Sequence, residues 1–116
     1  EMAQNISKIG DVDLLIARLD GLDGKKLREQ CDKLRDKLES GIIVLASANA
    51  DKVALLVAVS KDLHGRTKAG DIIKPLAEMV GGRGGGRPDL AQAGGTDVNS
   101  IDTMLEKAPE VIKQAL

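Results

Sequence analysis

Aromatic residues are missing from this sequence, whose 116 residues include no phenylalanine, tyrosine or tryptophan. Proteins that bind unpaired RNA commonly stack its bases on aromatic rings, and this chain excludes that mode of recognition. Contact with RNA would have to use phosphates, sugars, arginine planes or backbone groups. The core must likewise be built from isoleucine, leucine, valine, alanine and methionine.

Cysteine and histidine occur only once each, as Cys31 and His64. One cysteine cannot form an internal disulfide, and one Cys with one His cannot complete a closed zinc site within the chain. No recognisable motif places a serine or cysteine beside His64, so we predict a solvated or phosphate-contacting role for it rather than a catalytic one. We therefore expect no catalytic residue, no metal site and no cofactor in this segment, and a reduced, cytoplasmic setting.

The sequence also lacks an apolar run of the roughly 20 residues that cross a bilayer. Its first residues, Glu1 to Asn5, do not form a basic region followed by a hydrophobic one, as a signal peptide would. We expect a soluble chain with no membrane partner. Because position 1 is not methionine, we interpret the chain as a piece of a longer protein.

Neither sign of charge dominates, since 17 lysines and arginines stand against 18 aspartates and glutamates, for a net charge of −1. This balance argues against bulk electrostatic adhesion to RNA or to anionic lipid. The charge is unevenly distributed, because residues 61–87 carry +3 and residues 88–116 carry −3. The positive segment is either a phosphate-binding patch or an ordinary solvated face.

Apolar periodicity predicts an alternation of strands and helices along the chain. The expected strands cover residues 12–19, 42–46, 53–59 and, as a short addition, 90–93. The expected helices cover residues 23–39, 70–80 and 99 to the end. This order predicts an α/β fold, a single mixed β-sheet of about four to five strands with about three helices packed against it. The length suits a single globular domain over 1–116.

Several element boundaries have specific predictions. Asp23 is a good N-cap, and Cys31 falls on the apolar stripe of the helix that follows, so it reads as a small buried hydrophobe. Asn99 should begin the last helix with Asp102 at the capping-box position, and Pro109 should kink or split that helix. Residues 6–11 are either a partner strand or the last turn of an upstream helix, and residues 1–10 a remnant of an upstream helical part. The helix over 70–80 should turn five residues toward the sheet: Ile72, Ile73, Leu76, Ala77 and Val80.

Glycine is concentrated in residues 81–95, which hold seven of the chain's thirteen glycines. Gly81 and Gly82 have an adequate structural role in ending the preceding helix. We interpret the rest as a loop shaped around a ligand, because glycine costs conformational entropy and its N–H groups can converge on an anion. The segment is not a P-loop, since no Gly-Lys-Ser/Thr follows and Pro88 blocks the usual strand–loop–helix transition.

The same segment carries a family resemblance. The runs Gly-Gly-Arg-Gly-Gly-Gly-Arg-Pro at 81–88 and Ala-Gln-Ala-Gly-Gly at 91–95 resemble the signature of the C-terminal domain of bacterial alanyl-tRNA synthetase, in the DHH-associated domain family. The similarity continues upstream through 42–46, 59–62 and 68–71, in the family's order and with its approximate spacing. It therefore covers about the whole chain.

The resemblance implies a C-terminal tRNA-binding module. Similar domains grip the outer corner of the tRNA, its elbow, and help to couple aminoacylation with editing of mischarged alanine tRNA by other domains of the enzyme. ATP, magnesium and zinc are implied for those other domains only. The implied partners are tRNA, the rest of the synthetase and, through upstream helices, a second copy of the enzyme.

Two alternatives remain open at this point. The chain could be the nucleotide- or single-strand-binding half of a DHH-type phosphoesterase, whose relatives use a similar glycine loop. It could also be a dimerisation or spacer module. For RNA binding, the candidates are the cations near the glycine run, its glycines and one amide: Lys61, Arg66, Lys68, Arg83, Gly84, Gly85, Gly86, Arg87 and Gln92.

Overall fold

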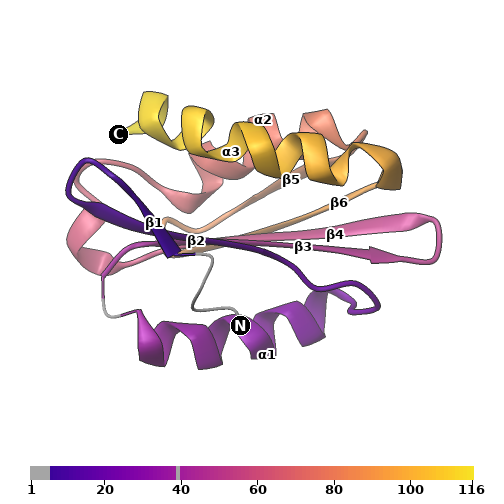
Figure 1. Ribbon diagram of the computed structural model, residues 1–116, viewed down its shortest axis with the longest axis horizontal. Helices are drawn as coiled ribbons and strands as arrows, with labels where there is room; N and C mark the ends of the chain where they lie inside the picture. The colour runs from indigo at the N-terminus through magenta and orange to yellow at the C-terminus, as the bar shows by residue number, and fades with distance from the viewer. Residues whose placement is uncertain (1–5, 39) are drawn as a thin grey trace.

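The computed structural model describes residues 6–38 and 40–116 and contains one six-stranded mixed sheet. The strands, in the spatial order β1-β2-β3-β4-β6-β5, are β1 (Ile6–Ile9), β2 (Val12–Arg18), β3 (Ile42–Asn49), β4 (Lys52–Val59), β6 (Leu90–Gly95) and β5 (Arg83–Gly86). Helix α1 (Gly24–Lys37) covers one face, and α2 (Ala69–Met79) and α3 (Ile101–Ala115) cover the other (Figure 1). The predicted α/β fold class is confirmed, with one strand more than the upper estimate.

The β2–α1–β3 segment is the only crossover between parallel neighbours in the described part of the chain. A parallel pair needs a long connection, and α1 supplies it. The predicted N-cap is confirmed, because the Asp23 side chain accepts a hydrogen bond of 2.9 Å from the backbone N–H of Lys26. Leu15 and Ala17 are buried on the α1 face, whereas Val12 and Leu14 are buried on the other, as predicted for a strand covered on both sides.

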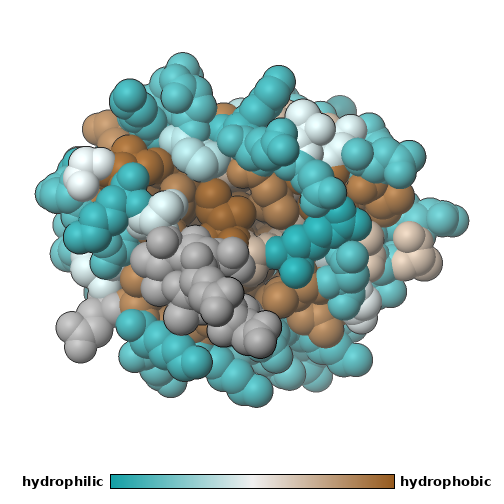
Figure 2. Space-filling view, viewed as in Figure 1, coloured by the Kyte–Doolittle hydropathy of each residue, from teal (hydrophilic) through white to brown (hydrophobic). Residues whose placement is uncertain are grey.

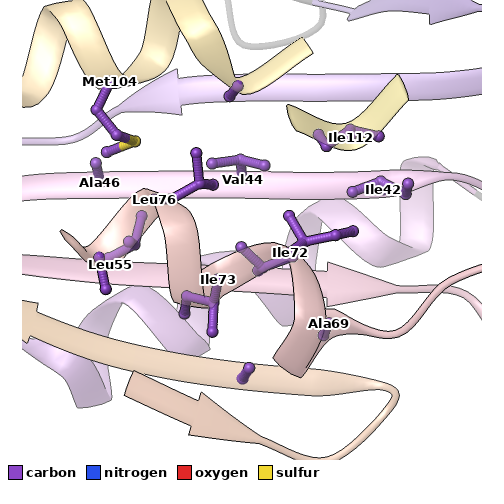
Figure 3. Packing of buried hydrophobic residues seen from close by; sticks show 14 of the residues in the cluster. Ile42, Val44, Ala46, Leu55, Ala69, Ile72, Ile73, Leu76, Met104 and Ile112 are labelled. Carbon is purple, nitrogen blue, oxygen red and sulfur yellow. The ribbon is translucent and has the colours of Figure 1, made fainter. Parts of the chain in front are cut away.

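Two aliphatic cores fill the spaces above and below the sheet. The larger one lies under α2 and α3, where Ile72, Ile73 and Leu76 of α2 meet Val44 and Leu55 of the sheet (Figure 3). All five residues predicted to face the sheet from α2 are completely buried. On the side shown in Figure 2, hydrophilic residues cover the outer surfaces of the two helical layers, and apolar residues gather in the band between them.

The second core lies beneath α1 and contains Cys31, which is fully buried as predicted. Burial raises the pKa of the Cys31 thiol to about 11, an effect larger than the opposing one of the Arg35 charge. A buried thiol that stays protonated at neutral pH is a poor nucleophile. Cys31 is therefore a packing residue.

The structure corrects several boundaries. Residues 6–9 form strand β1, so the strand alternative holds there, and residues 1–5 of the supposed helical remnant lie outside the described residues. The last helix begins after Ser100, not Asn99, and Asp102 accepts a hydrogen bond from Arg18 of β2 instead of closing a capping box. Pro109 does not split α3, which is continuous from Ile101 to Ala115.

The short strand predicted over 90–93 is confirmed as β6, which extends to Gly95. The largest correction concerns residues 83–89, where a ligand-wrapping loop was predicted. Arg83–Gly86 form strand β5, which pairs with β6 in a β-hairpin at one edge of the sheet. Its tip is held from two sides: the Ala69 N–H at the start of α2 donates to the Pro88 carbonyl at 2.9 Å, and the Val59 N–H donates to the Asp89 carbonyl at 3.0 Å. None of the helices in the described part is long and apolar enough to cross a membrane.

Candidate nucleic-acid interface

The glycines of the hairpin divide into two groups by what a side chain would meet. At Gly84, a Cβ atom would overlap the Cβ of Ala93 on the neighbouring strand, and at Gly86 it would lie 2.6 Å from the Ala91 Cα. Ala91 and Ala93 pack against the core under α2. Gly84 and Gly86 are therefore required by the close approach of β5 to β6 on that face.

Gly85 and Gly94 have no such requirement. No heavy atom lies within 4 Å of a Cβ built at Gly85, and at Gly94 the nearest is the Val53 carbonyl oxygen at an ordinary 3.7 Å. Neither residue has a positive φ. Because glycine weakens a strand relative to residues with side chains, packing within the chain does not account for these two glycines. Both are exposed, so close approach from outside the molecule would account for them.

Strand alternation places the two unexplained glycines on the same face as the arginines. In the hairpin register, Arg83 pairs with Gly94 and Gly85 with Gln92, and the Arg87 N–H donates to the Leu90 carbonyl at 3.0 Å. Leu90 belongs to the core beneath α1, so this row of residues lies on the α1 side of the sheet. We call the surface formed by Arg83, Gly85, Arg87, Gln92 and Gly94 the arginine shelf.

The arginine shelf is open because α1 packs on β3 and β4 rather than on the edge strand. Arg83 and Arg87 are exposed, four residues apart on an extended strand, so their Cα atoms are separated by about 13 Å with Gly85 between them. None of the five shelf residues is acidic. The arrangement presents two guanidinium groups on either side of a flat stretch of backbone.

Two hydrogen bonds join the hairpin to the flank of α1. The Gln92 side-chain amide donates from Nε2 to the Gly24 carbonyl at 2.8 Å, and Arg35 donates from Nη2 to the Asp89 carbonyl at 3.1 Å. Gly24 and Arg35 lie at opposite ends of the helix, so these contacts fix the shelf relative to the whole of α1. The predicted binding role of Gln92 thus coincides with a structural one.

A hollow of about 460 Å³ lies directly beside the shelf, at the end where α1 begins. Ser47, Ala54, Gly94 and Arg83 are aligned across four strands on the α1 face at this level. The first three of these residues are small, and α1 starts only at Gly24, opposite the next row, so the space above them stays open. The lining residues are Leu22, Asp23, Gly24, Asn49, Lys52, Val53, Ala54, Arg83, Gln92, Ala93 and Gly94.

Of the remaining predicted cations, Arg66 lies far from the shelf, whereas Lys61 and Lys68 lie near the hairpin tip. Arg66 donates to both carboxylate oxygens of Asp11, at 3.1 and 3.3 Å, in the β1–β2 turn at the opposite edge of the sheet. This contact holds the pKa of Asp11 below its ordinary value, first through the hydrogen bond. Lys68 is the N-cap of α2, and Lys61 borders a smaller cavity of about 210 Å³ near the hairpin tip.

The backbone of the glycine run does not form the predicted concave anion site. Hydrogen-bonded pairs alternate in an antiparallel ladder, so the Arg87–Leu90 pair implies that Gly85 bonds to Gln92. The N–H groups of Gly84 and Gly86 then point away from β6 at the sheet edge. The Nε2 of His64 lies 3.1 Å from the Val59 carbonyl, which gives that ring a structural contact.

The residues of this region that were not predicted include Arg35, Asn49 and Lys52. They come from segments distant in sequence from the glycine run, so local composition contains no signal for them. The helical period could have placed Gly24 and Arg35 on one flank of the predicted helix. Among the described residues, no three His, Cys, Asp or Glu side chains are grouped so that they could hold a metal ion.

Comparisons with known proteins bear on the family and the fold of the chain. The DHHA1 domain family model matches residues 11–114. The chain is 47% identical over its whole length to an alanine–tRNA ligase of Anaeromyxobacter dehalogenans and 51% identical over 94% of its length to that of Magnetococcus marinus. It spans only 13% and 12% of those two relatives. The crystal structure of the C-Ala domain from Aquifex aeolicus alanyl-tRNA synthetase matches with a TM-score of 0.85 and 27% identity, over 93% of this chain and 97% of that one.

Proposed function

The chain belongs to the DHHA1 domain family, and from this membership we propose that it is a tRNA-binding module of an alanyl-tRNA synthetase. The observation that carries the proposal is the arginine shelf, in which Gly85 lies exposed between Arg83 and Arg87 without a packing reason to be glycine. A nucleic-acid backbone that lies against the strand would use both features. It needs cations for its phosphates and a floor without side chains.

The shelf suits recognition of shape and charge. Arginine guanidinium groups bind phosphate oxygens through paired hydrogen bonds, and these contacts position an RNA without reading its sequence. Two such contacts, about 13 Å apart along β5, would fix the direction of one sugar–phosphate backbone. The absence of aromatic residues agrees with this mode of binding.

The finer parts of the proposal follow from the family. The shelf would hold the tRNA elbow, and the module would thereby support aminoacylation of alanine tRNA and editing by other domains of the enzyme. Its location would be the cytoplasm, and its partners would include those domains and, through upstream helices, a second copy. ATP, magnesium and zinc would serve the other domains, so we assign them no residue of this chain.

A binding experiment with two RNAs tests the proposal. Fluorescence anisotropy would compare full-length alanine tRNA with an acceptor-stem minihelix that lacks the elbow, at two salt concentrations. The double variant Arg83→Ala/Arg87→Ala should bind the full tRNA at least about tenfold more weakly. Its salt dependence should fall by about 1.4 to 1.8 in the slope of log Kd against log salt, for two lost phosphate contacts.

The matched control is Lys8→Ala/Arg66→Ala, which also removes two positive charges but at the β1 edge of the sheet, opposite the shelf. This variant should bind the full tRNA nearly as well as the parent chain. Loss of affinity in the control but not in the shelf variant would move the interface to the β1 edge. Equal affinity for both RNAs would contradict recognition of the elbow.

A further inference from the structure

We propose that the hollow beside the arginine shelf is a subsite for one unpaired nucleobase, whose flanking phosphates lie on the shelf. The inference rests on the proposed RNA binding and adds a ligand class and a place. It begins from the continuity of the two surfaces. Arg83, Gln92 and Gly94 belong to both the shelf and the lining of the hollow.

The shape of the hollow follows from the alignment of small residues. Ala54 of β4 pairs with Gly94 of β6, which pairs with Arg83 of β5. The floor of the hollow is therefore apolar at β4 and cationic at the edge strand β5. Leu22 forms a side wall just before the start of α1. The hollow therefore has a nearly flat apolar floor that leads to a guanidinium group.

The chemistry of the lining fits a nucleobase better than a second phosphate or an aliphatic chain. A base is flat and apolar on its faces but polar at its edge, and here Leu22 and Ala54 meet the exposed side chains of Asn49 and Lys52. The Asn49 amide offers both donors and an acceptor to a base edge. An arginine plane can also stack on an unstacked base, which gives Arg83 a second use without any aromatic ring.

Charge complementarity argues for a nucleotide within RNA. Arg83 and Lys52 border the hollow, and Arg87 continues the cationic surface along the shelf. Asp23 is the single acidic lining residue, and its Oδ1 already caps α1 by accepting from the Lys26 N–H. A base still paired within a duplex is stacked between its neighbours, so only an unpaired or flipped nucleotide could enter.

Gly94 allows a clean test because its position tolerates a side chain. A Cβ there meets only the Val53 carbonyl oxygen at 3.7 Å, so Gly94→Val should fill the hollow without disturbing the strand. Gly65→Val is the matched control, since Gly65 is exposed and no heavy atom lies within 4 Å of its Cβ position. Circular dichroism and urea unfolding would verify that both variants fold.

The measurement is a ¹H–¹⁵N NMR titration with three probes: the four nucleoside 5′-monophosphates, a single-stranded RNA hexamer and a blunt RNA duplex. The hexamer should shift the amide signals of Ala54 and Gly94, and the duplex should leave those two unchanged. Gly94→Val should weaken hexamer binding by about tenfold, the scale of one nucleotide contact, and Gly65→Val should not.

The outcomes separate this inference from the proposed function. Full affinity of Gly94→Val for the hexamer and the tRNA, together with a loss in Arg83→Ala/Arg87→Ala, would overturn the base subsite alone. Equal affinity of the monophosphates and the hexamer would assign the hollow to free nucleotides and overturn its role in RNA. If neither variant changed tRNA binding, the shelf itself would be wrong.

Discussion

The two faces of the β5–β6 hairpin use the same residue type for opposite purposes. On the face toward α2, Gly84 and Gly86 allow β5 to approach the buried Ala91 and the half-buried Ala93. On the face toward α1, Gly85 and Gly94 are exposed and meet no internal atom closely. One face of the glycine run therefore serves the fold, and the other is open for a ligand.

The largest effect on stability is expected when a side chain is added on the hairpin face toward α2. Gly84→Val should lower the free energy of unfolding by about 3 kcal/mol or more, because its Cβ would overlap that of Ala93. Gly85→Val should change the free energy of unfolding by no more than about 1 kcal/mol in either direction. Urea unfolding of both variants measures this contrast, and similar losses in the two would abolish the distinction between the faces.

A smaller effect is expected where the hairpin joins α1. Gln92→Ala removes the 2.8 Å hydrogen bond from the Gln92 amide to the Gly24 carbonyl, which should cost about 1 kcal/mol of unfolding free energy. Gln92 also belongs to both the shelf and the lining of the hollow, so RNA affinity should fall slightly as well. A variant with unchanged stability would mean that this contact does not fix the shelf.

The smallest effect is expected at the other edge of the sheet. The pKa of Asp11 is lowered from 3.8 by Arg66, so their pairing stabilises the fold above that value and is lost as the pH falls through the lower, folded-state pKa. Both side chains are well exposed, so the contribution is small. Asp11→Asn should slightly lower the free energy of unfolding above about pH 4, and the difference from the parent chain should vanish as the pH falls through the folded-state pKa of Asp11. The variant should leave tRNA binding unchanged at neutral pH. A clear loss of tRNA affinity would place the interface at this edge.

Most of the fold could be predicted from the sequence, because most helices and strands are specified by patterns of neighbouring residues. The apolar stripe of α1, the N-cap at Asp23 and the β-rich runs of β3 and β4 each act within a few residues, and the structure confirms them. Strand β5 could not be predicted in this way. Three of its four residues are glycine, so it has no apolar alternation, and only its register with β6 makes it a strand.

The candidate site was predicted in composition but not in arrangement. Arg83, Arg87 and Gln92 do share one surface, whereas Arg66 pairs with Asp11 at the far edge. Residues 61–87 carry a net charge of +3, but the chain runs from one edge of the sheet to the other over this segment. Its cations therefore do not form one positive patch. The hollow depends on where α1 begins relative to Ala54 and Gly94, which is a tertiary relation.

RNA should lie against the α1 face of the hairpin, and Gly85→Glu tests this binding mode most directly. This change adds a negative charge to the open shelf at a position with no neighbour within 4 Å, and Gly65→Glu adds the same charge elsewhere. Fluorescence anisotropy with full-length alanine tRNA should show at least about tenfold weaker binding for Gly85→Glu only. Equal affinities of the two variants would mean that RNA does not bind the α1 face of the hairpin.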